Sequence, residues 1–224
     1  MRRSLTLIFG ILPSSRAKNA LLNSLGHAIH PTASIGPLLI VGCANIQMGE
    51  HTRIGPFNVV RHLTAFSMGS YSEIGQWNWI SAAPFLVQAS HSPLAGNFRL
   101  GCHSAVTSRH YFDASGGIDI EEFVTIAGVR SVFMSHGINV QEGVLESSSI
   151  SVRRYSMVGG SCSFVLGATV PEHSVIAMGS VVTVGLTEPD SLYAGVPAKF
   201  KKLLPRGKYA TRTTGPVLPR PSTT

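Results

Sequence analysis

Residues 157–183 read MVGGSCSFVLGATVPEHSVIAMGSVVT, and an aliphatic or aromatic residue recurs in this stretch at every sixth position. The repeated positions are Val158, Phe164, Val170, Ile176 and Val182. Four positions after each of the first four stands a small residue: Cys162, Ala168, Ser174 and Ser180. A period of six fits neither the alternation of an ordinary strand nor the 3.6-residue period of a helix. It predicts a parallel β-solenoid, in which each short strand turns one apolar side chain inward and the small residues let the chain turn a corner.

The same spacing extends upstream through most of the chain. Its further positions are Ile35, Val41, Met48, Ile54, Val60, Phe66, Met68, Ile74, Ile80, Leu86, Ile120, Ile126, Val132 and Val152. Two stretches, residues 87–119 and 134–151, interrupt it. We therefore expect an all-β solenoid domain over residues 31–203, from which loops leave at the two interruptions. Because a bare solenoid is a rod, we expect functional residues at these loops or where chains pack side by side.

The two ends of the chain differ from the repeat. Within the N-terminal segment, residues 1–30, the pattern of residues 14–26 predicts a short helix that covers the open end of the solenoid. The apolar run Leu5–Leu12 is too short to span a bilayer, and we expect it to pack on the domain, with peripheral membrane contact left open. The Pro- and Thr-rich tail, residues 204–224, is expected to be flexible or to lie over a neighbour.

Composition excludes several classes of function. Charged residues make up 13% of the chain and glycine occurs 23 times, which suits many short strands and tight turns. The formal net charge of +7 attracts anionic partners, but the cations are scattered and form no basic stripe, which argues against nucleic-acid binding. Three cysteines without CxxC spacing favour a reducing, cytoplasmic location over a disulfide framework or a cysteine zinc site.

The end of the repeat carries the most specific motif. Residues 176–202 read IAMGSVVTVGLTEPDSLYAGVPAKFKK, and the parts GSVVT and YAGVPAK resemble the closing sequence of the hexapeptide-repeat acyltransferases, in particular their sugar O-acetyltransferases. The resemblance covers residues 35–203 and is strongest after Ile120. It implies a left-handed parallel β-helix, a homotrimer with sites between subunits, and acetyl-coenzyme A as the acyl donor.

His136 stands at the edge of the second interruption. Acyl transfer to a hydroxyl needs a base that takes the hydroxyl proton, and histidine suits this role because its ordinary pKa lies near neutrality. In the hexapeptide-repeat acyltransferases, which the closing sequence of this chain resembles, the base is a histidine just before an extended loop. The resemblance therefore selects His136 as the catalytic base among the nine histidines of the chain.

Donor contacts are implied by the same resemblance. Turn residues of successive coils hold the pantetheine arm in the family, and the corresponding positions are Gly160, Met178 and Thr183. Lys199 and Lys202 would bind the phosphates of the donor as point charges. The alternative for each lysine is an ordinary solvated side chain at the surface. The chain departs from the family at Met178, which replaces a usual small residue, and at Val184, which stands where a lysine commonly follows the threonine. Lys201 is a candidate to replace that lysine.

The acceptor side is indicated by the stretch SRHYFDASGG, which holds Arg109, His110 and Asp113. These side chains are candidates to line the cleft of His136, and Asp113 either orients a histidine or a sugar hydroxyl or caps a turn. Trp77 and Trp79 should point outward, and with Phe57 and Tyr71 at equivalent positions they indicate an aromatic file at a subunit contact.

The leading hypothesis is thus a coenzyme A-dependent O-acetyltransferase of a sugar or glycan precursor, as in polysaccharide biosynthesis. N-acetylation of an amino sugar is the nearest variant, and a non-catalytic solenoid assembly module is a second alternative. A metal-dependent carbonic anhydrase on this scaffold would need three converging histidines, whereas His103 and His110 are seven residues apart and His136 has no histidine nearby. No metal is therefore expected.

Overall fold

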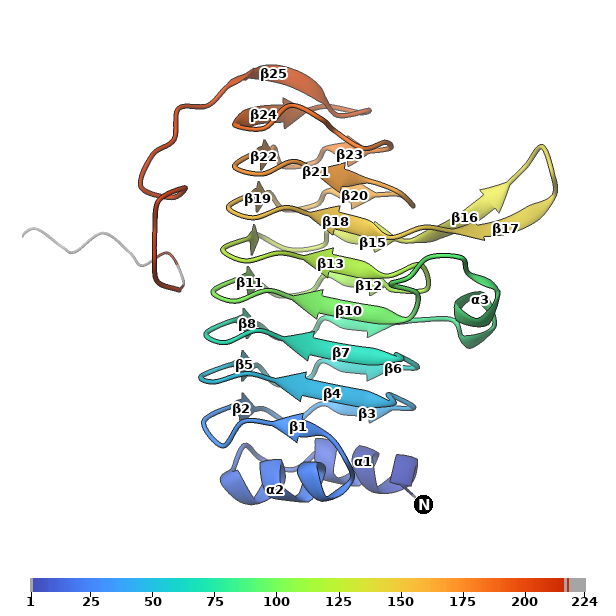
Figure 1. The fold of residues 1–224 in the computed structure, drawn as a ribbon, viewed down its shortest axis with the longest axis vertical. Helices are drawn as coiled ribbons and strands as arrows, with labels where there is room; N and C mark the ends of the chain where they lie inside the picture. The colour runs from blue at the N-terminus through green and yellow to red at the C-terminus, as the bar shows by residue number, and fades with distance from the viewer. Residues whose placement is uncertain (1, 216, 218–224) are drawn as a thin grey trace, which may run out of the picture.

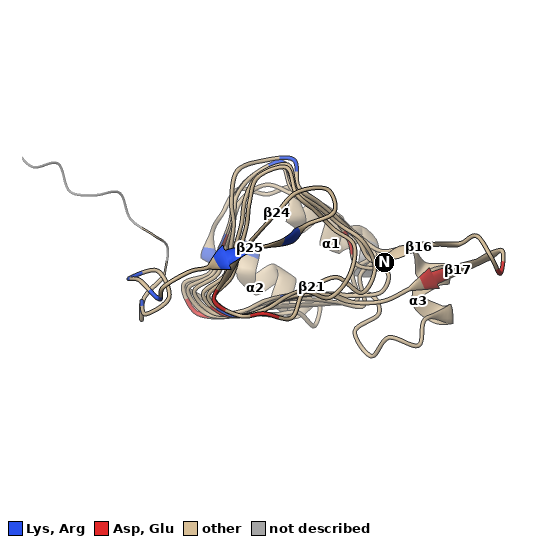
Figure 2. Cartoon of the chain, turned by 90° about the horizontal axis from the view of Figure 1, so that it is seen from above, with Lys and Arg blue, Asp and Glu red and all other residues tan. Residues whose placement is uncertain are grey.

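The computed structural model describes residues 2–215 and 217 of the chain. The chain winds into a left-handed parallel β-helix with three faces, as the repeat and the family resemblance predict (Figure 1). Each coil contributes one short strand to each face, and equivalent strands of successive coils pair in parallel. Figure 2, which looks down on the coils, shows the triangular section.

The strands are short because each spans one side of the triangle. The first face consists of β1 (Ala28–Ile29), β4 (Asn45–Met48), β7 (Ala65–Met68), β10 (Asn97–Leu100), β13 (Ile118–Ile120), β18 (Ile150–Val152) and β21 (Thr169–Val170). The second face consists of β2 (Ser34–Ile35), β5 (Arg53–Ile54), β8 (Glu73–Ile74), β11 (Ala105–Val106), β14 (Thr125–Ile126), β19 (Met157–Val158), β22 (Val175–Ile176), β24 (Ser191–Ala194) and the antiparallel β25 (Lys199–Leu203). The third face consists of β3 (Leu39–Val41), β6 (Val59–Arg61), β9 (Trp79–Ser81), β12 (Tyr111–Asp113), β15 (Val132–Met134), β20 (Ser163–Phe164) and β23 (Val181–Val182).

Most of the predicted repeat positions fill the interior, but the third face requires two corrections. In β3 the inward residue is Ile40, 2% exposed, whereas the predicted Val41 is 37% exposed. In β15 the inward residue is Phe133, which stacks on the phenyl ring of Phe164, and the predicted Val132 points outward. Each error is a shift of one residue, and successive side chains of a strand point to opposite faces.

The first interruption is shorter than predicted. Leu100, Val106 and Phe112 keep the six-residue spacing and are all buried, so residues 97–113 form a regular coil. The spacing among these three residues was the signal that would have revealed it. Leu86, predicted as a repeat position, instead lies in the short helix α3 (Pro84–Ala89).

Both interruptions leave the solenoid at the corner between the third and first faces. One carries α3, and the other forms a hairpin of β16 (His136–Asn139) and β17 (Val144–Ser147). Figure 2 shows them projecting on the same side of the triangle. They touch where Ser147 Oγ donates a hydrogen bond of 2.7 Å to Ser90 Oγ.

Two helices close the open first coil, α1 (Arg2–Gly10) and α2 (Arg16–Ser24). Ser15 begins α2 by accepting a hydrogen bond from the backbone N–H of Lys18. The buried Lys18 ammonium lies 2.7–3.1 Å from four backbone carbonyl oxygens, those of Gly10, Leu12, Ile35 and Gly36. These contacts join α1, α2 and the first coil.

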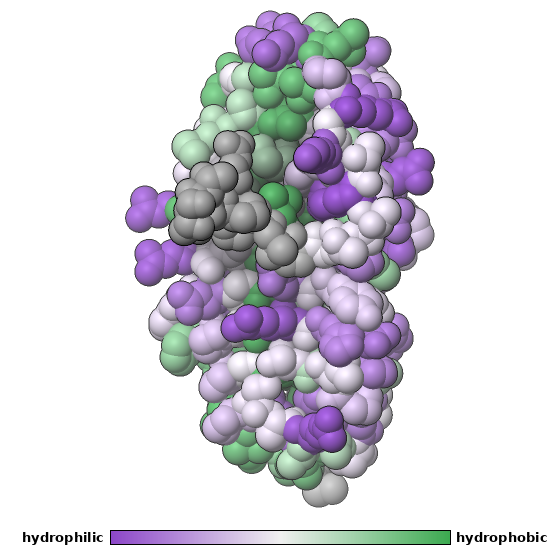
Figure 3. Space-filling view, turned by 90° about the vertical axis from the view of Figure 1, so that its left-hand side faces the viewer, coloured by the Kyte–Doolittle hydropathy of each residue, from purple (hydrophilic) through white to green (hydrophobic). Residues whose placement is uncertain are grey.

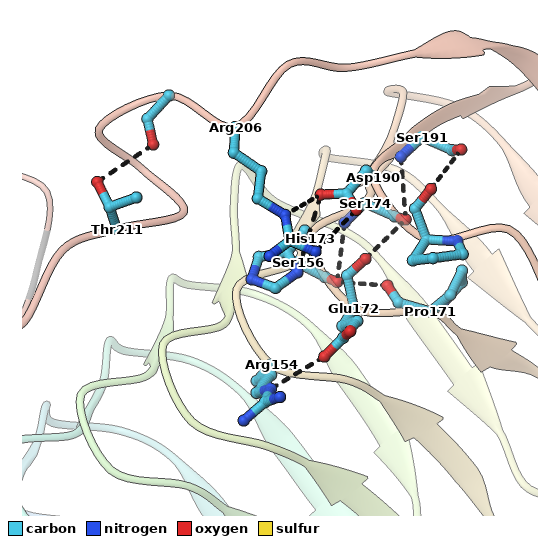
Figure 4. A network of polar contacts seen from close by, with 12 residues as sticks. Arg154, Ser156, Pro171, Glu172, His173, Ser174, Asp190, Ser191, Arg206 and Thr211 are labelled. Carbon is cyan, nitrogen blue, oxygen red and sulfur yellow. Dashed lines mark hydrogen bonds and ion pairs between the residues drawn. The ribbon is translucent and has the colours of Figure 1, made fainter.

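The C-terminal segment lies along the corner between the first and second faces, on the opposite side from the hairpin (Figure 2). Arg206 begins it with a bidentate ion pair to Asp190, at 2.6 and 2.9 Å (Figure 4). Tyr209 Oη is 3.0 Å from both Thr125 Oγ1 and the carbonyl oxygen of Ser156. Residues 206–212 of the predicted tail thus contact the solenoid of their own chain, whereas residues 216 and 218–224 lie outside the described part of the chain.

Candidate active site

His136 is the first residue of the hairpin strand β16, two residues after the last residue of β15. The strand β15 pairs with β12 of the preceding coil, so that Asp113 lies opposite Met134. This register brings the Asp113 carboxylate to the base of the hairpin, and His136 Nδ1 lies 2.6 Å from Asp113 Oδ2. The imidazole is 28% exposed and the carboxylate 5% exposed, so the pair has a buried end and an open end.

Asp113 accepts five hydrogen bonds. Oδ1 accepts from the backbone N–H and the hydroxyl of Ser115, at 3.2 and 2.6 Å. Oδ2 accepts from the backbone N–H and the hydroxyl of Ser135, at 3.1 and 3.0 Å, and from His136. These donors fix the position of the carboxylate, which in turn fixes the plane of the imidazole.

The arrangement selects one tautomer of the histidine. Because an ionised carboxylate only accepts hydrogen bonds, the contact with Asp113 places the imidazole proton on Nδ1. Nε2 of His136 then carries a lone pair at the open end of the pair. This geometry suits a general base, and a carboxylate behind it stabilises the imidazolium that forms when the base takes a proton.

Ser115 and Ser135 were not selected from the sequence. A serine two residues after Asp113 and a serine directly before His136 were the available signals, but serine also stands at several other turns, such as Ser72, Ser156 and Ser174. Of the predicted acceptor residues, only Asp113 is brought to His136.

His110 lies at a different corner, between the second and third faces, and is 2% exposed. Its Nδ1 accepts the backbone N–H of Ser131 at 3.1 Å, and its Nε2 lies 2.9 Å from Thr107 Oγ1. Burial lowers the pKa of His110 to about 4, although a hydrogen bond with the backbone of Gly128 acts in the opposite direction. Both ring nitrogens are thus occupied by the chain itself, and the geometry gives no support to substrate binding by His110.

Arg109 precedes His110 at the tip of that corner, with an exposed side chain and a φ of 62°. It is therefore separated from His136 by the third face. Only a ligand or a second chain at that corner would meet it.

The predicted donor residues gather toward the upper coils. Gly160 and Met178 occupy the corner between the second and third faces, where the backbone N–H of Gly179 donates to the carbonyl oxygen of Gly160 at 3.0 Å. Met178 is 75% exposed, and Thr183 is exposed just after β23. Gly160, by contrast, is buried and has the backbone of Val129 close by.

Lys199 and Lys202 lie on β25 with exposed side chains. Three residues apart, they would point to opposite faces of a regular strand. The register shift in the β24–β25 pair places Lys199 opposite Ala194 and Lys202 opposite Leu192. Because directly paired residues share a face, this irregularity turns both lysines to the same side.

The residues of the predicted aromatic file lie at three different places. Trp79 points outward from the third face and is 38% exposed, while Trp77 stacks on Phe57 at the neighbouring corner with ring centroids 4.7 Å apart. Tyr71 belongs to another corner, where six rings stack beneath the C-terminal segment: His51, Tyr71, His103, Phe123, Tyr155 and His173. The C-terminal segment of the same chain therefore covers part of this file of six rings.

A hollow of about 1120 Å³ runs along the first face. It is lined by residues of both charges, including Arg99, Asp119 and Arg153, and by neither His136 nor Asp113. Within residues 2–215 and 217, no group of three or more His, Cys, Asp or Glu side chains is placed to hold a metal ion.

Comparison with known proteins gives the class of the fold. No protein-family model matches the chain, and no curated protein matches it. Among solved structures, it is similar to a variant of AntD, an N-acyltransferase from Bacillus cereus in complex with dTDP and coenzyme A, with 16% identity, a TM-score of 0.58, and coverage of 71% of this chain and 84% of that one. It is also similar to a hexapeptide-repeat containing acetyltransferase from Vibrio cholerae, with 18% identity, a TM-score of 0.50 and coverage of 92% of both chains.

At these identities the similarity establishes the architecture. The chain has the left-handed parallel β-helix fold found in acyltransferases of the hexapeptide-repeat type.

Proposed function

We propose that this protein is a coenzyme A-dependent acyltransferase, which transfers an acetyl group to a hydroxyl of a sugar or glycan precursor with His136 as general base. The observation that carries the proposal is the pairing of His136 Nδ1 with the buried Asp113 carboxylate at 2.6 Å. It leaves Nε2 as a proton acceptor at the open end of the pair.

In the proposed reaction, the acceptor hydroxyl lies against His136 Nε2. Nε2 takes the hydroxyl proton while the oxygen attacks the thioester carbonyl carbon, so that a C–O bond forms and a tetrahedral oxyanion develops. Collapse of the oxyanion breaks the C–S bond, and the coenzyme A sulfur leaves with the proton that His136 returns. Asp113 stabilises the imidazolium between these two proton transfers.

Donor binding is proposed at the upper coils. Gly160, Met178 and Thr183 would contact the pantetheine arm, and Lys199 and Lys202, turned to one side of β25, would bind the phosphates. The AntD variant bound to coenzyme A supports an acyl-coenzyme A donor for this fold.

The proposed donor and base sites do not lie together in one chain. His136 follows β15 at one end of the third face, whereas Gly160 precedes β20 at the other end. The three residues of β15 alone separate these ends by roughly 10 Å. A second chain packed on the third face would bring its own corner to His136, which supports sites between subunits, as in the homotrimer that the family resemblance implies.

The outer side of the third face suits such packing. Paired positions on successive strands form one outward column: Leu39, Val59, Trp79, Tyr111 and Val132. Leu39, Trp79 and Tyr111 are each more than a third exposed. Apolar and aromatic side chains of this kind are enriched at subunit interfaces.

The nearest alternative is N-acetylation of an amino sugar, and it is supported by the similarity to AntD, which is an N-acyltransferase. A non-catalytic assembly module is the second alternative, favoured only if no donor binds. The three cysteines of the chain show no CxxC spacing, which supports the proposed cytoplasmic location.

The test begins with a calorimetric titration of the full chain with acetyl-coenzyme A. We expect saturable binding near one site per chain, followed by release of free coenzyme A thiol with a hydroxyl sugar from an acceptor panel. His136→Ala should lower turnover roughly 10²–10⁴-fold, whereas His30→Ala, at an exposed histidine of the first coil, should match the parent. Donor binding with turnover of amino sugars alone would select N-acetylation, and no binding at millimolar donor would refute the acyltransferase.

A further inference from the structure

The lower end of the solenoid is closed by α1 and α2 (Figure 1). One side of α1 sits directly on the first coil, because a Cβ atom at Gly10 would lie 2.9 Å from the carbonyl oxygen of Leu38 and 3.3 Å from the side chain of Ile40. The backbone N–H of Leu38 also donates to the carbonyl oxygen of Gly10 at 3.0 Å. The opposite side of α1 therefore faces away from the solenoid.

That outer side is apolar. Ile8 lies two residues from Gly10, about 160° around the helix, and is 52% exposed. Ile11 is 52% exposed and Leu12 36% exposed in the turn that follows, and Leu21 of α2 is 38% exposed while its neighbour Leu22 is buried. Figure 3 shows apolar surface at this lower end of the molecule. Terminal caps of solenoids ordinarily present a polar outer face, so an apolar cap calls for a partner.

The charge of this end has a single sign. The first acidic residue of the chain is Glu50, and the 49 residues before it contain four cations, Arg2, Arg3, Arg16 and Lys18. Lys18 is buried with the backbone carbonyls, whereas Arg16 is exposed at the beginning of α2. Arg2 and Arg3 are the first two residues of α1. The end surface thus combines exposed aliphatic side chains with exclusively basic residues.

We propose that this surface, formed by Ile8, Ile11, Leu12, Arg16 and Leu21, docks the protein on an anionic lipid bilayer. Aliphatic side chains of a short amphipathic helix lie at the boundary between headgroups and acyl chains, while arginines bind lipid phosphates. A second copy of this chain is a poorer occupant, because it would bring an identical surface of the same charge against the first. Along residues 2–215 and 217, no helix is both long and apolar enough to cross a membrane. The contact we infer is therefore at the membrane surface.

The experiment is flotation of the full chain with vesicles of phosphatidylcholine containing phosphatidylglycerol, in parallel with vesicles of phosphatidylcholine alone. We expect flotation with the anionic vesicles, strong weakening in high salt, and little flotation with the neutral ones. Ile8→Ser with Ile11→Ser should reduce partitioning at least tenfold, and Arg16→Glu several-fold. Neither change touches a buried side chain, and a thermal melt checks that the fold is kept.

The matched control is Val140→Ser with Val144→Ser, which removes two exposed aliphatic side chains from the hairpin instead. This variant should float like the parent. The proposal is overturned if the parent does not float, if neutral vesicles bind equally, or if the hairpin control and the Ile8 variant lose binding alike. It is also overturned if the Ile8 variant changes only the oligomeric state, since the surface would then lie between copies of the chain. Flotation needs neither donor nor acceptor, so its result is independent of the proposed acyl transfer.

Discussion

Asp113 and His136 are 23 residues apart in the sequence, yet His136 Nδ1 lies 2.6 Å from an oxygen of the Asp113 carboxylate. One turn of the solenoid separates them, and the pairing of β12 with β15 brings them together. Asp113 acts on the proposed reaction through the histidine. It is therefore a positioning residue.

Asp113→Asn should lower turnover roughly 10²–10⁴-fold, because a carboxamide that donates to Nδ1 would move the imidazole proton to Nε2. The measurement is kcat and its pH profile with a hydroxyl acceptor from the panel described above, together with a melting curve. A purely structural role would reduce stability and leave the pH profile unchanged. Asp119→Asn is the control, because Asp119 pairs with Arg99 on the first face. Parent-like turnover and pH profile in a folded Asp113→Asn would contradict the proposed role.

Lys199→Ala and Lys202→Ala should each weaken acetyl-coenzyme A binding about tenfold, because each removes one cation from the same side of β25. The loss should appear in Kd by calorimetry and shrink as salt is added, since exposed charges are screened. Lys208→Ala, at an exposed lysine of the C-terminal segment, should leave the affinity unchanged. Equal effects of all three substitutions would indicate a general charge effect and no phosphate site.

The free energy of unfolding should decrease as the pH is lowered from 6.5 to 4, because of His110. Burial holds its folded pKa at about 4, below the ordinary value of 6.5, so the unfolded chain binds a proton in this interval and the folded chain does not. The neutral His110 therefore contributes about 3 kcal/mol to the free energy of unfolding. This contribution is fully present above pH 6.5 and is lost as the pH falls to 4.

His110→Asn should remove this pH dependence and keep the fold. Asn78 occupies the equivalent slot in the preceding coil, where its side chain donates to the Thr107 carbonyl oxygen. Urea unfolding at pH 4.5 and 7.5, at one protein concentration, gives the difference in the free energy of unfolding between the two pH values for the parent and for the variant. His30→Asn, at an exposed histidine, serves as the control. If the pH dependence of the free energy of unfolding is the same in His110→Asn as in the parent, His110 is not its cause.

Trp79→Glu should dissociate the proposed trimer, because it places a charge in the apolar column of the third face. Light scattering should give three times the 23.8 kDa chain mass for the parent and a lower mass for the variant. Ile8→Glu, on the lower end, should keep the parent mass. If Trp79→Glu remains folded by circular dichroism and keeps the parent mass, the third face is not the subunit interface.

Tyr209→Phe should loosen the C-terminal segment, because it removes the hydroxyl that contacts Thr125 and Ser156. Arg212 stacks 4.0 Å from the Tyr209 ring centroid and would keep part of the contact. A net loss of about 1 kcal/mol in the free energy of local detachment should speed trypsin cleavage after Arg206, Lys208 and Arg212 several-fold. Tyr111→Phe, on the third face, should be cleaved like the parent. An unchanged rate in Tyr209→Phe would show that the hydroxyl does not hold the segment.

The repeat itself was readable from the sequence because the solenoid is built from local rules. An inward aliphatic residue and a small corner residue recur at fixed spacing, so Val158, Phe164 and Ile176 could be placed in the core without knowing which strands pair. The same regularity marked His136 as the point where the coil breaks. Where the spacing slipped by one residue, at Ile40 and Phe133, the sequence assigned the wrong side chain to the core.

The site was decided by contacts between coils and at strand irregularities. Which residue of the preceding coil faces His136 depends on the length of each intervening turn, and only the folded register selects Asp113 and excludes His110. The same holds for Lys199 and Lys202, which a register shift in one strand pair turns to a common side. Sequence by itself determined the period and the position of the break, because both depend on the spacing of side chains along the chain. Only the tertiary structure decided which polar groups meet, because that depends on the stacking of one coil on the next.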